Sequence, residues 1–169
     1  KFLEVEETMK YNNLAKARSF GADFTFNYQV LPSLAIGGGY SYTDAKAQYT
    51  EDQNDPNYMK YLPINATSYH NANWKIAWTH KDVGVSLFGR YQSTRYYITD
   101  GNGKAYQLWR LNVRSSLLKT KKWNLGMNAG IDNIFNYIDR TPFGKNRGTT
   151  SPGRTLYLSL NVKFQNKQK

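Results

Sequence analysis

The sequence predicts an all-β fold, a transmembrane antiparallel β-barrel to which this chain contributes about seven strands. One observation behind this prediction is that apolar and polar residues alternate along those segments. Another is that tight turns and long polar loops follow one another in strict alternation. A third is that no stretch approaches the ~20 apolar residues of a membrane-spanning helix, and the mean hydropathy is −0.72. Only helices and closed barrels satisfy their backbone hydrogen bonds in lipid, so a membrane protein of this composition is a barrel.

The alternation is clearest in the last segment, 155–164. Its even-numbered residues, from Leu156 to Phe164, are all apolar, whereas the odd-numbered residues are polar or, at Tyr157, aromatic. Successive side chains of a strand point to opposite faces, so this segment has one apolar and one polar face. In none of the segments does the apolar face carry Asp, Glu, Lys or Arg. A lipid-facing wall requires this, because a charge at mid-bilayer costs a membrane barrel about 2–4 kcal/mol.

Short turns on one side of the sheet and long loops on the other are typical of outer-membrane barrels. The predicted strands are residues 19–30, 34–43, 69–79, 84–92, 106–118, 123–132 and 155–164. Tight turns are predicted at 31–33, 80–83 and 119–122, and long loops at 44–68, 93–105 and 133–152. Aromatic residues of the apolar face gather near strand ends, as in the two aromatic girdles of such barrels, whereas Trp74 lies nearer mid-strand. A water-soluble barrel or sandwich with the apolar face inside is the alternative.

Charge and composition narrow the class of protein further. The 169 residues include 23 Lys and Arg against 12 Asp and Glu, a formal net charge of +11. Such an excess suggests nucleic-acid binding, but the basic residues are dispersed over turns, loops and the C-terminal segment, so no nucleic-acid partner is expected. The absence of cysteine fits export through an oxidising compartment. Lys1 is expected to be a processed terminus or an internal position of a longer chain.

Motifs near the two ends of the chain resemble one family. The run Asp132–Tyr137, followed by Pro152-Gly153-Arg154 and a final strand ending at Phe164, is similar to the "DNLFN … PGR … F" ending of TonB-dependent outer-membrane receptors. Residues 11–23 resemble a strand start of the same family, with Asp23 where Glu is usual, and residues 34–45 resemble one of its strands. A second departure is that residues follow Phe164, whereas the assembly signal of this family normally ends the chain.

The resemblance implies a 22-stranded barrel, of which this chain would be about the last seven strands. Residues 1–18 would be an extracellular loop or a strand remnant, 19–164 the C-terminal barrel strands and loops, and 165–169 a periplasmic tail. The implied barrel-assembly signal consists of Tyr157, Leu160, Val162 and Phe164. Partners implied are the remainder of the barrel and a plug domain, in the same or a separate chain, the TonB complex, and lipopolysaccharide and lipid of the bacterial outer membrane.

Aromatic and basic residues in the loops are the predicted ligand-binding surface, since Tyr and Arg favour amphipathic contacts at low entropic cost. The candidates are Tyr58, Tyr61, His70, Arg95, Tyr96, Tyr97, Arg140, Phe143 and Arg147. Loop packing and contact with lipopolysaccharide phosphates are the alternative roles. Charges on the polar face are expected to contact a plug domain or guide an anionic solute, the first being favoured. These charges are Lys75, Arg90, Arg110 and Arg114.

No catalytic or metal site is expected. His70 and His80 lie at opposite ends of one predicted strand, ~30 Å apart at the usual strand rise, so they form no joint site. His70 fits either an axial haem ligand or a girdle residue. The acidic run between Glu51 and Asn57 matches no standard calcium loop. An outer-membrane lipase or protease would have to rely on His70, so the protein is not expected to be an enzyme or to hold a resident cofactor.

Two functions follow from this interpretation. The first is active import of a scarce, bulky nutrient, such as a siderophore–iron complex, haem or cobalamin, as part of a TonB-dependent receptor. The alternative is a complete eight-stranded outer-membrane barrel acting as an adhesin, structural protein or pore. In that case residues 1–8 would supply the eighth strand, although their apolar and charged residues do not separate onto two faces.

Overall fold

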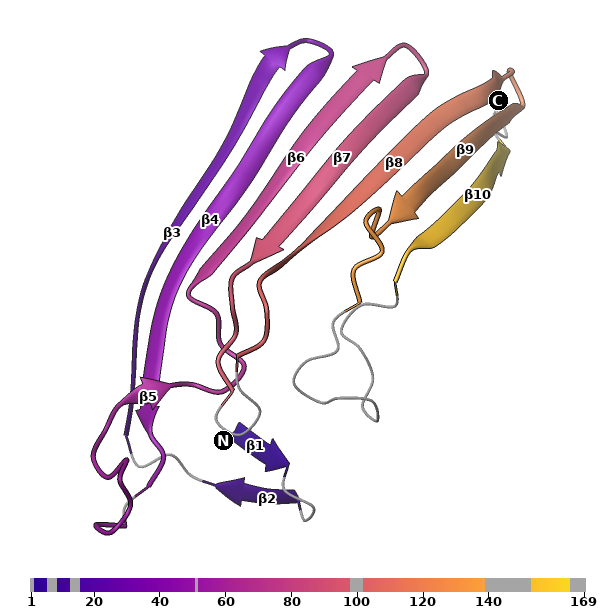
Figure 1. The fold of residues 1–169 in the computed structure, drawn as a ribbon. Coiled ribbons are helices and arrows are strands. Elements are labelled where there is room, and N and C mark those ends of the chain that lie inside the picture. Colours follow the sequence, from indigo (N-terminus) through magenta and orange to yellow (C-terminus); the bar gives the residue numbers. More distant parts are fainter. Residues whose placement is uncertain are drawn as a thin grey trace.

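The computed structural model describes residues 2–5, 9–12, 16–50, 52–97, 102–138 and 153–164, and these residues form strands and their connections. Figure 1 shows one large curved sheet, with tight turns at one end and long loops at the other, called here the turn end and the loop end. The strands are β1 (Phe2–Val5), β2 (Met9–Asn12), β3 (Lys16–Leu31), β4 (Leu34–Gln48), β5 (Leu62–Pro63), β6 (His70–His80), β7 (Val83–Gln92), β8 (Tyr106–Lys119), β9 (Trp123–Asp132) and β10 (Thr155–Phe164).

The strands of the main sheet follow the order β10-β9-β8-β7-β6-β4-β3, with β5 paired to β4, and β1 pairs with β2 in a separate two-stranded sheet. All of these pairs are antiparallel. The all-β antiparallel prediction is therefore confirmed. Across the described residues, no helix is both long and apolar enough to pass through a membrane.

The strand register confirms the predicted division into two faces. One row of directly opposed residues crosses the sheet and is apolar along its length, except for the hydroxyl of a tyrosine at its end: Leu156, Ile131, Leu111, Leu87, Ile76, Ile36 and Tyr28. The adjacent row, on the opposite face, is mostly polar: Thr155, Asp132, Arg110, Phe88, Lys75, Gly37 and Asn27. We call these the outer and the inner face. Each strand alternates between them because its side-chain period is two residues.

The sheet is a single layer without a core of its own. In the part of the chain that the structure describes, the buried hydrophobic residues are Ala45, Ala47 and Tyr97. Large apolar side chains of the outer face are exposed instead: Phe20 and Leu156 are each 71% accessible. A water-soluble sandwich would bury this face under a second sheet. The described residues provide no such layer, so the expected covering is lipid.

Aromatic residues of the outer face pack in two bands. At the loop end, Phe20 meets Tyr42 edge-on at 6.5 Å between ring centroids. At the turn end, Trp123 and Phe164 lie 4.0 Å apart. Trp74, which the sequence places away from both bands, lies across Gly89 of β7 and 5.0 Å from Trp109. A glycine on the neighbouring strand leaves room for this indole ring to lie flat on the sheet.

The structure corrects the predicted ends of two strands. Residues 44–48 were expected in a long loop, but they extend β4 and pair with residues 16–20 of β3. Their charged residues made them resemble a loop, whereas the polar environment beyond the aromatic band tolerates charges on either face. The N-terminal residues also differ from the eight-stranded alternative. Phe2–Val5 pairs with β2 and adds no strand to the described main sheet.

The packing of side chains on the inner face near β10 requires a glycine at position 130. Tyr157 lies across Gly130, and its hydroxyl oxygen accepts a hydrogen bond from Asn112 Nδ2 at 2.8 Å. A Cβ at Gly130 would lie 2.6 Å from the carbonyl oxygen of Leu111, which is backbone and has little freedom to move. Gly126 lies four residues earlier on the same face, and a Cβ there would have its nearest neighbour, the carbonyl oxygen of Ser115, at 3.7 Å.

We predict that Gly130→Ala destabilises the complete protein by about 1–3 kcal/mol, because the added methyl overpacks the space under Tyr157. The measurement is the temperature at which the folded band is lost in heat-modifiable gel migration. Gly126→Ala is the matched control and should behave like the parent protein. If the two variants lost the folded band at the same temperature, the proposed close packing of Tyr157 over Gly130 would be contradicted.

Candidate functional site

Four residues at the loop end form an aromatic cluster around one arginine, called here the loop-end cluster: Arg95, Tyr97, Tyr106 and Tyr137. The Arg95 guanidinium carbon lies 5.2 Å from the centroid of the Tyr106 ring and 5.8 Å from that of Tyr97. Tyr106 and Tyr137 stack nearly parallel, with centroids 4.9 Å apart and an interplanar angle of 5°. Contacts of this kind are stronger when desolvated, and Arg95 is only 5% exposed.

Backbone pairing holds Arg95 in this position. Its N–H donates to the carbonyl of Gly103 at 2.9 Å, and Gly103 N–H donates back at 2.8 Å. The next residue, Tyr96, donates to the carbonyl of Thr67 at 3.0 Å. Two loops therefore continue the sheet beyond β6 and β7 for a few residues. These backbone hydrogen bonds therefore fix the position of Arg95 relative to the sheet.

Side-chain hydrogen bonds connect the loop-end cluster to the inner face. Tyr106 lies opposite Gln92, and Gln92 lies opposite Asn71. Tyr106 Oη donates to Gln92 Oε1, Gln92 Nε2 donates to Ser68 Oγ at 3.1 Å, and Ser68 Oγ donates to Asn71 Oδ1 at 3.1 Å. The cluster thus stands at the loop end of the inner face. The buried Arg95 holds these rings in place, and aromatic side chains at such a position are typical of binding surfaces.

The predicted binding residues are distributed over several places. Arg95 and Tyr97 join the loop-end cluster, and Tyr96 supports it through its backbone. Tyr61 lies instead under the Arg18 guanidinium at 4.5 Å, and Tyr58 belongs to the turn that begins at Asp55. Three further candidates lie outside the described residues: Arg140, Phe143 and Arg147.

His70 lies on the outer face. Its Nδ1 is 2.7 Å from the hydroxyl of Tyr40, and its ring is 5.4 Å from that of Tyr42. Both tyrosines belong to the loop-end aromatic band, so this environment matches the girdle role considered for His70. His80 stacks on Trp78 at the turn end of the same strand.

Tyr137 of the loop-end cluster lies in a predicted loop, although it is not among the candidates given above. Two further residues of the site were missed by the sequence argument, Tyr106 and Gln92. Both stand inside predicted strands, where the search for ligand contacts considered only loops. Their position in the alternation was the available signal, because even-numbered residues of β7, and of β8 as far as Ser116, belong to the inner face.

The inner face is predominantly basic along its length. Arg110 forms an ion pair with Asp132, which is directly opposite on β9. Lys75 Nζ lies 5.5 Å from the centroid of the Phe88 ring, also directly opposite. Arg90 and Arg114 share this face, as the sequence predicts.

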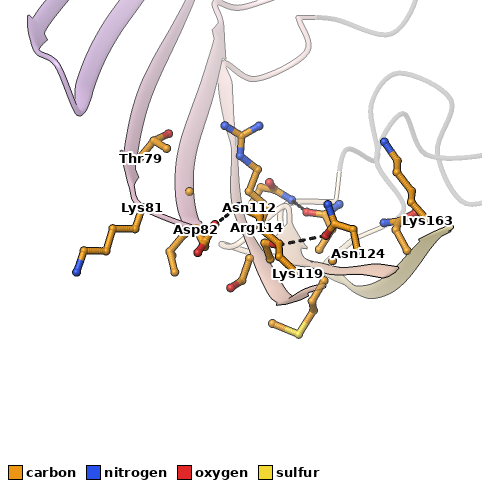
Figure 2. Close-up of a pocket in the computed structure, with 16 residues that line it drawn as sticks. Thr79, Lys81, Asp82, Asn112, Arg114, Lys119, Asn124 and Lys163 are labelled. Atoms are coloured by element: carbon orange, nitrogen blue, oxygen red, sulfur yellow. Dashed lines mark hydrogen bonds and ion pairs between the residues drawn. The ribbon is translucent and has the colours of Figure 1, made fainter. Parts of the chain in front are cut away.

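A groove of about 710 Å³ occupies the turn end of the inner face (Figure 2). Lys119 pairs with Asp82 at its edge, and Arg114 occupies the space left by Gly84. Lys81 and Lys163 add positive charge to the lining. The floor is amide-rich, and Asn112 Nδ2 donates to Asn128 Oδ1 at 2.6 Å. This lining is suited to a polar, acidic surface.

The predicted assembly-signal residues divide between the two faces of β10. Tyr157 is on the inner face, whereas Leu160, Val162 and Phe164 are on the outer face. Among the described residues, no group of three or more His, Asp or Glu side chains is placed to hold a metal ion. One side chain beyond the aromatic band has a shifted pKa. The hydrogen bond that the Lys46 ammonium donates to the Asp44 carboxylate raises the pKa of Lys46, which lies outside the membrane-spanning part of β4.

Residues 3–134 match the family model described as "TonB dependent receptor-like, beta-barrel". The chain belongs to the TonB-dependent receptor family. Two solved structures share the fold. The unliganded ferric citrate transporter FecA aligns with a TM-score of 0.67 at 19% identity, over 86% of this chain and 24% of that one. The copper transporter OprC aligns with a TM-score of 0.59 at 18% identity, over 88% of this chain and 24% of that one.

The chain therefore spans about a quarter of the length of these solved relatives, and its sheet is part of a barrel. Both relatives are named as transporters. A comparison with curated proteins found no match.

We predict that Tyr106→Ala loosens the loop-end cluster, since it removes both the stack on Tyr137 and the surface under Arg95. Aromatic and cation–π contacts of this kind contribute about 1–2 kcal/mol together, so the amides of Tyr96 and Gly103 should exchange hydrogen roughly tenfold faster. Tyr106→Phe keeps the ring and loses the hydroxyl, and it should show a smaller increase. Hydrogen exchange followed by mass spectrometry measures both. Unchanged exchange in Tyr106→Ala would show that the backbone pairing alone holds Arg95.

Proposed function

We propose that this chain is the C-terminal barrel part of an outer-membrane receptor that binds and imports a scarce, bulky nutrient, with energy coupled through TonB. The observation that carries the proposal is the pairing of a lipid-compatible outer face with a basic inner face that ends in the loop-end cluster. The wall of a membrane barrel needs the lipid-compatible outer face, and capture of an anionic ligand needs the basic inner face. The nutrient class proposed is a siderophore–iron complex, haem or cobalamin. The names of the two solved relatives, ferric citrate and copper transporters, favour a metal-containing cargo.

The partners proposed follow from the open edges of the sheet and from its charge. In the described main sheet, β3 and β10 are the two edge strands. Lipid satisfies no backbone hydrogen bonds, so the remainder of the barrel must pair with both edges. A plug domain inside that barrel would rest on the basic inner face and the turn-end groove, and the TonB complex would act on it from the periplasm.

The orientation proposed places the turn end in the periplasm and the loop end outside the cell. The loop-end cluster then meets ligands arriving from the medium, and lipopolysaccharide surrounds the loop-end aromatic band. No catalytic residue is proposed, and the import role requires none in this part of the protein.

The proposal is tested by uptake in the source bacterium. Deleting the gene of the complete receptor should abolish energy-dependent accumulation of one of four labelled probes, namely ferric citrate, haem, cyanocobalamin or copper(II). Restoring the gene should recover it, and dissipating the proton-motive force should abolish it again. The control is a variant in which Lys121 and Lys122, both in an exposed turn, are changed to Gln. Accumulation that is independent of the proton-motive force would refute the TonB-coupled mechanism.

A further inference from the structure

The last strand of the sheet, β10, has no tight turn to set its register against β9. β9 ends at Asp132 and β10 begins at Thr155, whereas β8 and β9 are joined by residues 120–122 alone. The length and type of a short hairpin turn fix how two strands pair, but a long connection leaves the pairing open. β10 is also an edge strand, so within the described sheet it pairs with β9 alone (Figure 1).

The separation into two faces leaves more than one register possible for β10. A shift by one residue would exchange its faces, but a shift by two would return every side chain to its own face. The aliphatic residues of β10 would then still lie opposite apolar partners on β9. These outer-face partners are Leu125, Met127, Ala129 and Ile131. The contact of Tyr157 with Gly130 distinguishes the registers inside the sheet, and a second set of contacts does so at the loop end.

The two motifs that frame this connection in the sequence, Asp132–Tyr137 and Gly153-Arg154, are joined by hydrogen bonds. Arg154 N–H donates to Asn136 Oδ1 at 2.9 Å, and Arg154 Nε–H donates to the carbonyl oxygen of Ile134 at 2.9 Å. Both bonds tie the residue directly before β10 to the turn directly after β9. We call Asn133, Asn136, Gly153 and Arg154 the register clamp. Once Arg154 is bound there, Thr155 enters the sheet opposite Asp132, which is the observed register.

Asn133 holds the turn after β9 in one shape. Its side chain is buried, its Nδ2 donates to the carbonyl oxygen of Tyr137 at 2.7 Å, and its Oδ1 accepts from Tyr137 N–H at 2.9 Å. Asn136 N–H donates to the carbonyl oxygen of Asn133 at 2.8 Å. The φ angles of Asn133 and Asn136 are 51° and 55°, a left-handed conformation that Asn adopts more readily than most residues. The acceptor for Arg154 is therefore already in position.

The same turn is attached to β8 on its other side. Ile134 N–H donates to the carbonyl oxygen of Trp109 at 3.0 Å, and the Phe135 ring meets the Trp109 ring edge-on at 6.2 Å. Asp132 forms its ion pair with Arg110. The clamp thus refers the start of β10 to two strands of the sheet, β8 and β9.

Glycine is required at position 153 for the clamp to close. Its φ is 85°, and a Cβ there would lie 3.1 Å from Asn136 Oδ1, the oxygen that accepts the Arg154 N–H. A larger residue would strain the backbone and press on this acceptor.

We propose that the register clamp selects the register of the final strand. Among the pairings that keep the two faces apart, it favours the one in which Thr155 lies opposite Asp132. β10 then pairs with β9 from the loop end toward the turn end, and Tyr157 arrives over Gly130. The proposal concerns the assembly of this pair of strands and is independent of the nutrient and of the energy coupling proposed above.

The test traps the register of β10 while the complete receptor refolds from urea into lipid vesicles. Leu158 lies opposite Ala129, and a shift by two residues would place it opposite Met127 or Ile131. Three double variants combine Leu158→Cys with Ala129→Cys, Met127→Cys or Ile131→Cys, and any cysteine elsewhere in the receptor is replaced by serine. A disulfide requires Cβ atoms about 4 Å apart, which diagonal neighbours do not reach. An oxidant added during refolding therefore reports the register as the ratio of shifted to native cross-linking.

Asn136→Gly combined with Arg154→Ala removes both hydrogen bonds of the clamp and still permits a positive φ at position 136. The loss of two hydrogen bonds should raise the ratio of shifted to native cross-linking roughly tenfold. Asn136→Asp combined with Arg154→Lys keeps an acceptor and a donor, so its ratio should stay near that of the parent. Lys121→Gln combined with Lys122→Gln, in the turn at the other end of β9, is the control and should not change the ratio.

Two results would overturn the proposal. One is the same ratio in the parent and in the variant without the clamp, even if heat-modifiable migration shows a lower folded yield, because the clamp would then contribute stability alone. The other is an equal rise in the variant that keeps an acceptor and a donor. Nutrient uptake is measured separately, so failure of the import proposal leaves the cross-linking result interpretable.

Discussion

Within the described part of the chain, no second protein layer covers the large apolar side chains of the outer face, and this constraint governs the rest of the structure. A single sheet cannot bury its own face, so its stability depends on hydrocarbon on one side and on polar contacts on the other. The strict alternation of the strands follows directly, because a shift of one residue would exchange the two faces. The open edges follow as well, since strands β3 and β10 need partners that the described sheet does not supply. Membership in the TonB-dependent receptor family accounts for all three features together.

Side chains pack differently on the two faces of the sheet. On the outer face, rings lie flat over glycines, as Trp74 does over Gly89, and form bands where the membrane meets water. On the inner face, opposed polar residues form hydrogen bonds and ion pairs, as Arg110 does with Asp132. On the outer face of β3 and β4, charge appears only toward the loop end, at Lys16, Arg18, Asp44 and Lys46. We therefore expect the hydrocarbon to end where β3 changes from apolar to charged residues.

Much of the fold was predictable because a β-strand in a membrane wall has a period that the sequence displays without reference to distant residues. The face of Leu111 or Lys75 follows from parity alone. The ends of β3 and β4 were not predictable in this way, since charged residues beyond the membrane look the same in a strand and in a loop. The loop-end cluster was predicted only in part. Arg95 and Tyr97 were found by composition, but the stack of Tyr106 on Tyr137 joins segments distant in sequence, and no local pattern encodes it.

The most direct test of the account compares neighbouring residues on the two faces of one strand. Spin labels at Leu87 and Ser86 of β7, and at Leu158 and Ser159 of β10, are placed one at a time in the complete receptor in lipid bilayers. The account predicts that labels at the two leucine positions collide with oxygen dissolved in lipid and are protected from an aqueous nickel reagent, and that labels at the two serine positions are less accessible to oxygen. Labels at Leu87 and Leu158 that are shielded from both reagents would place the outer face against protein and contradict the account.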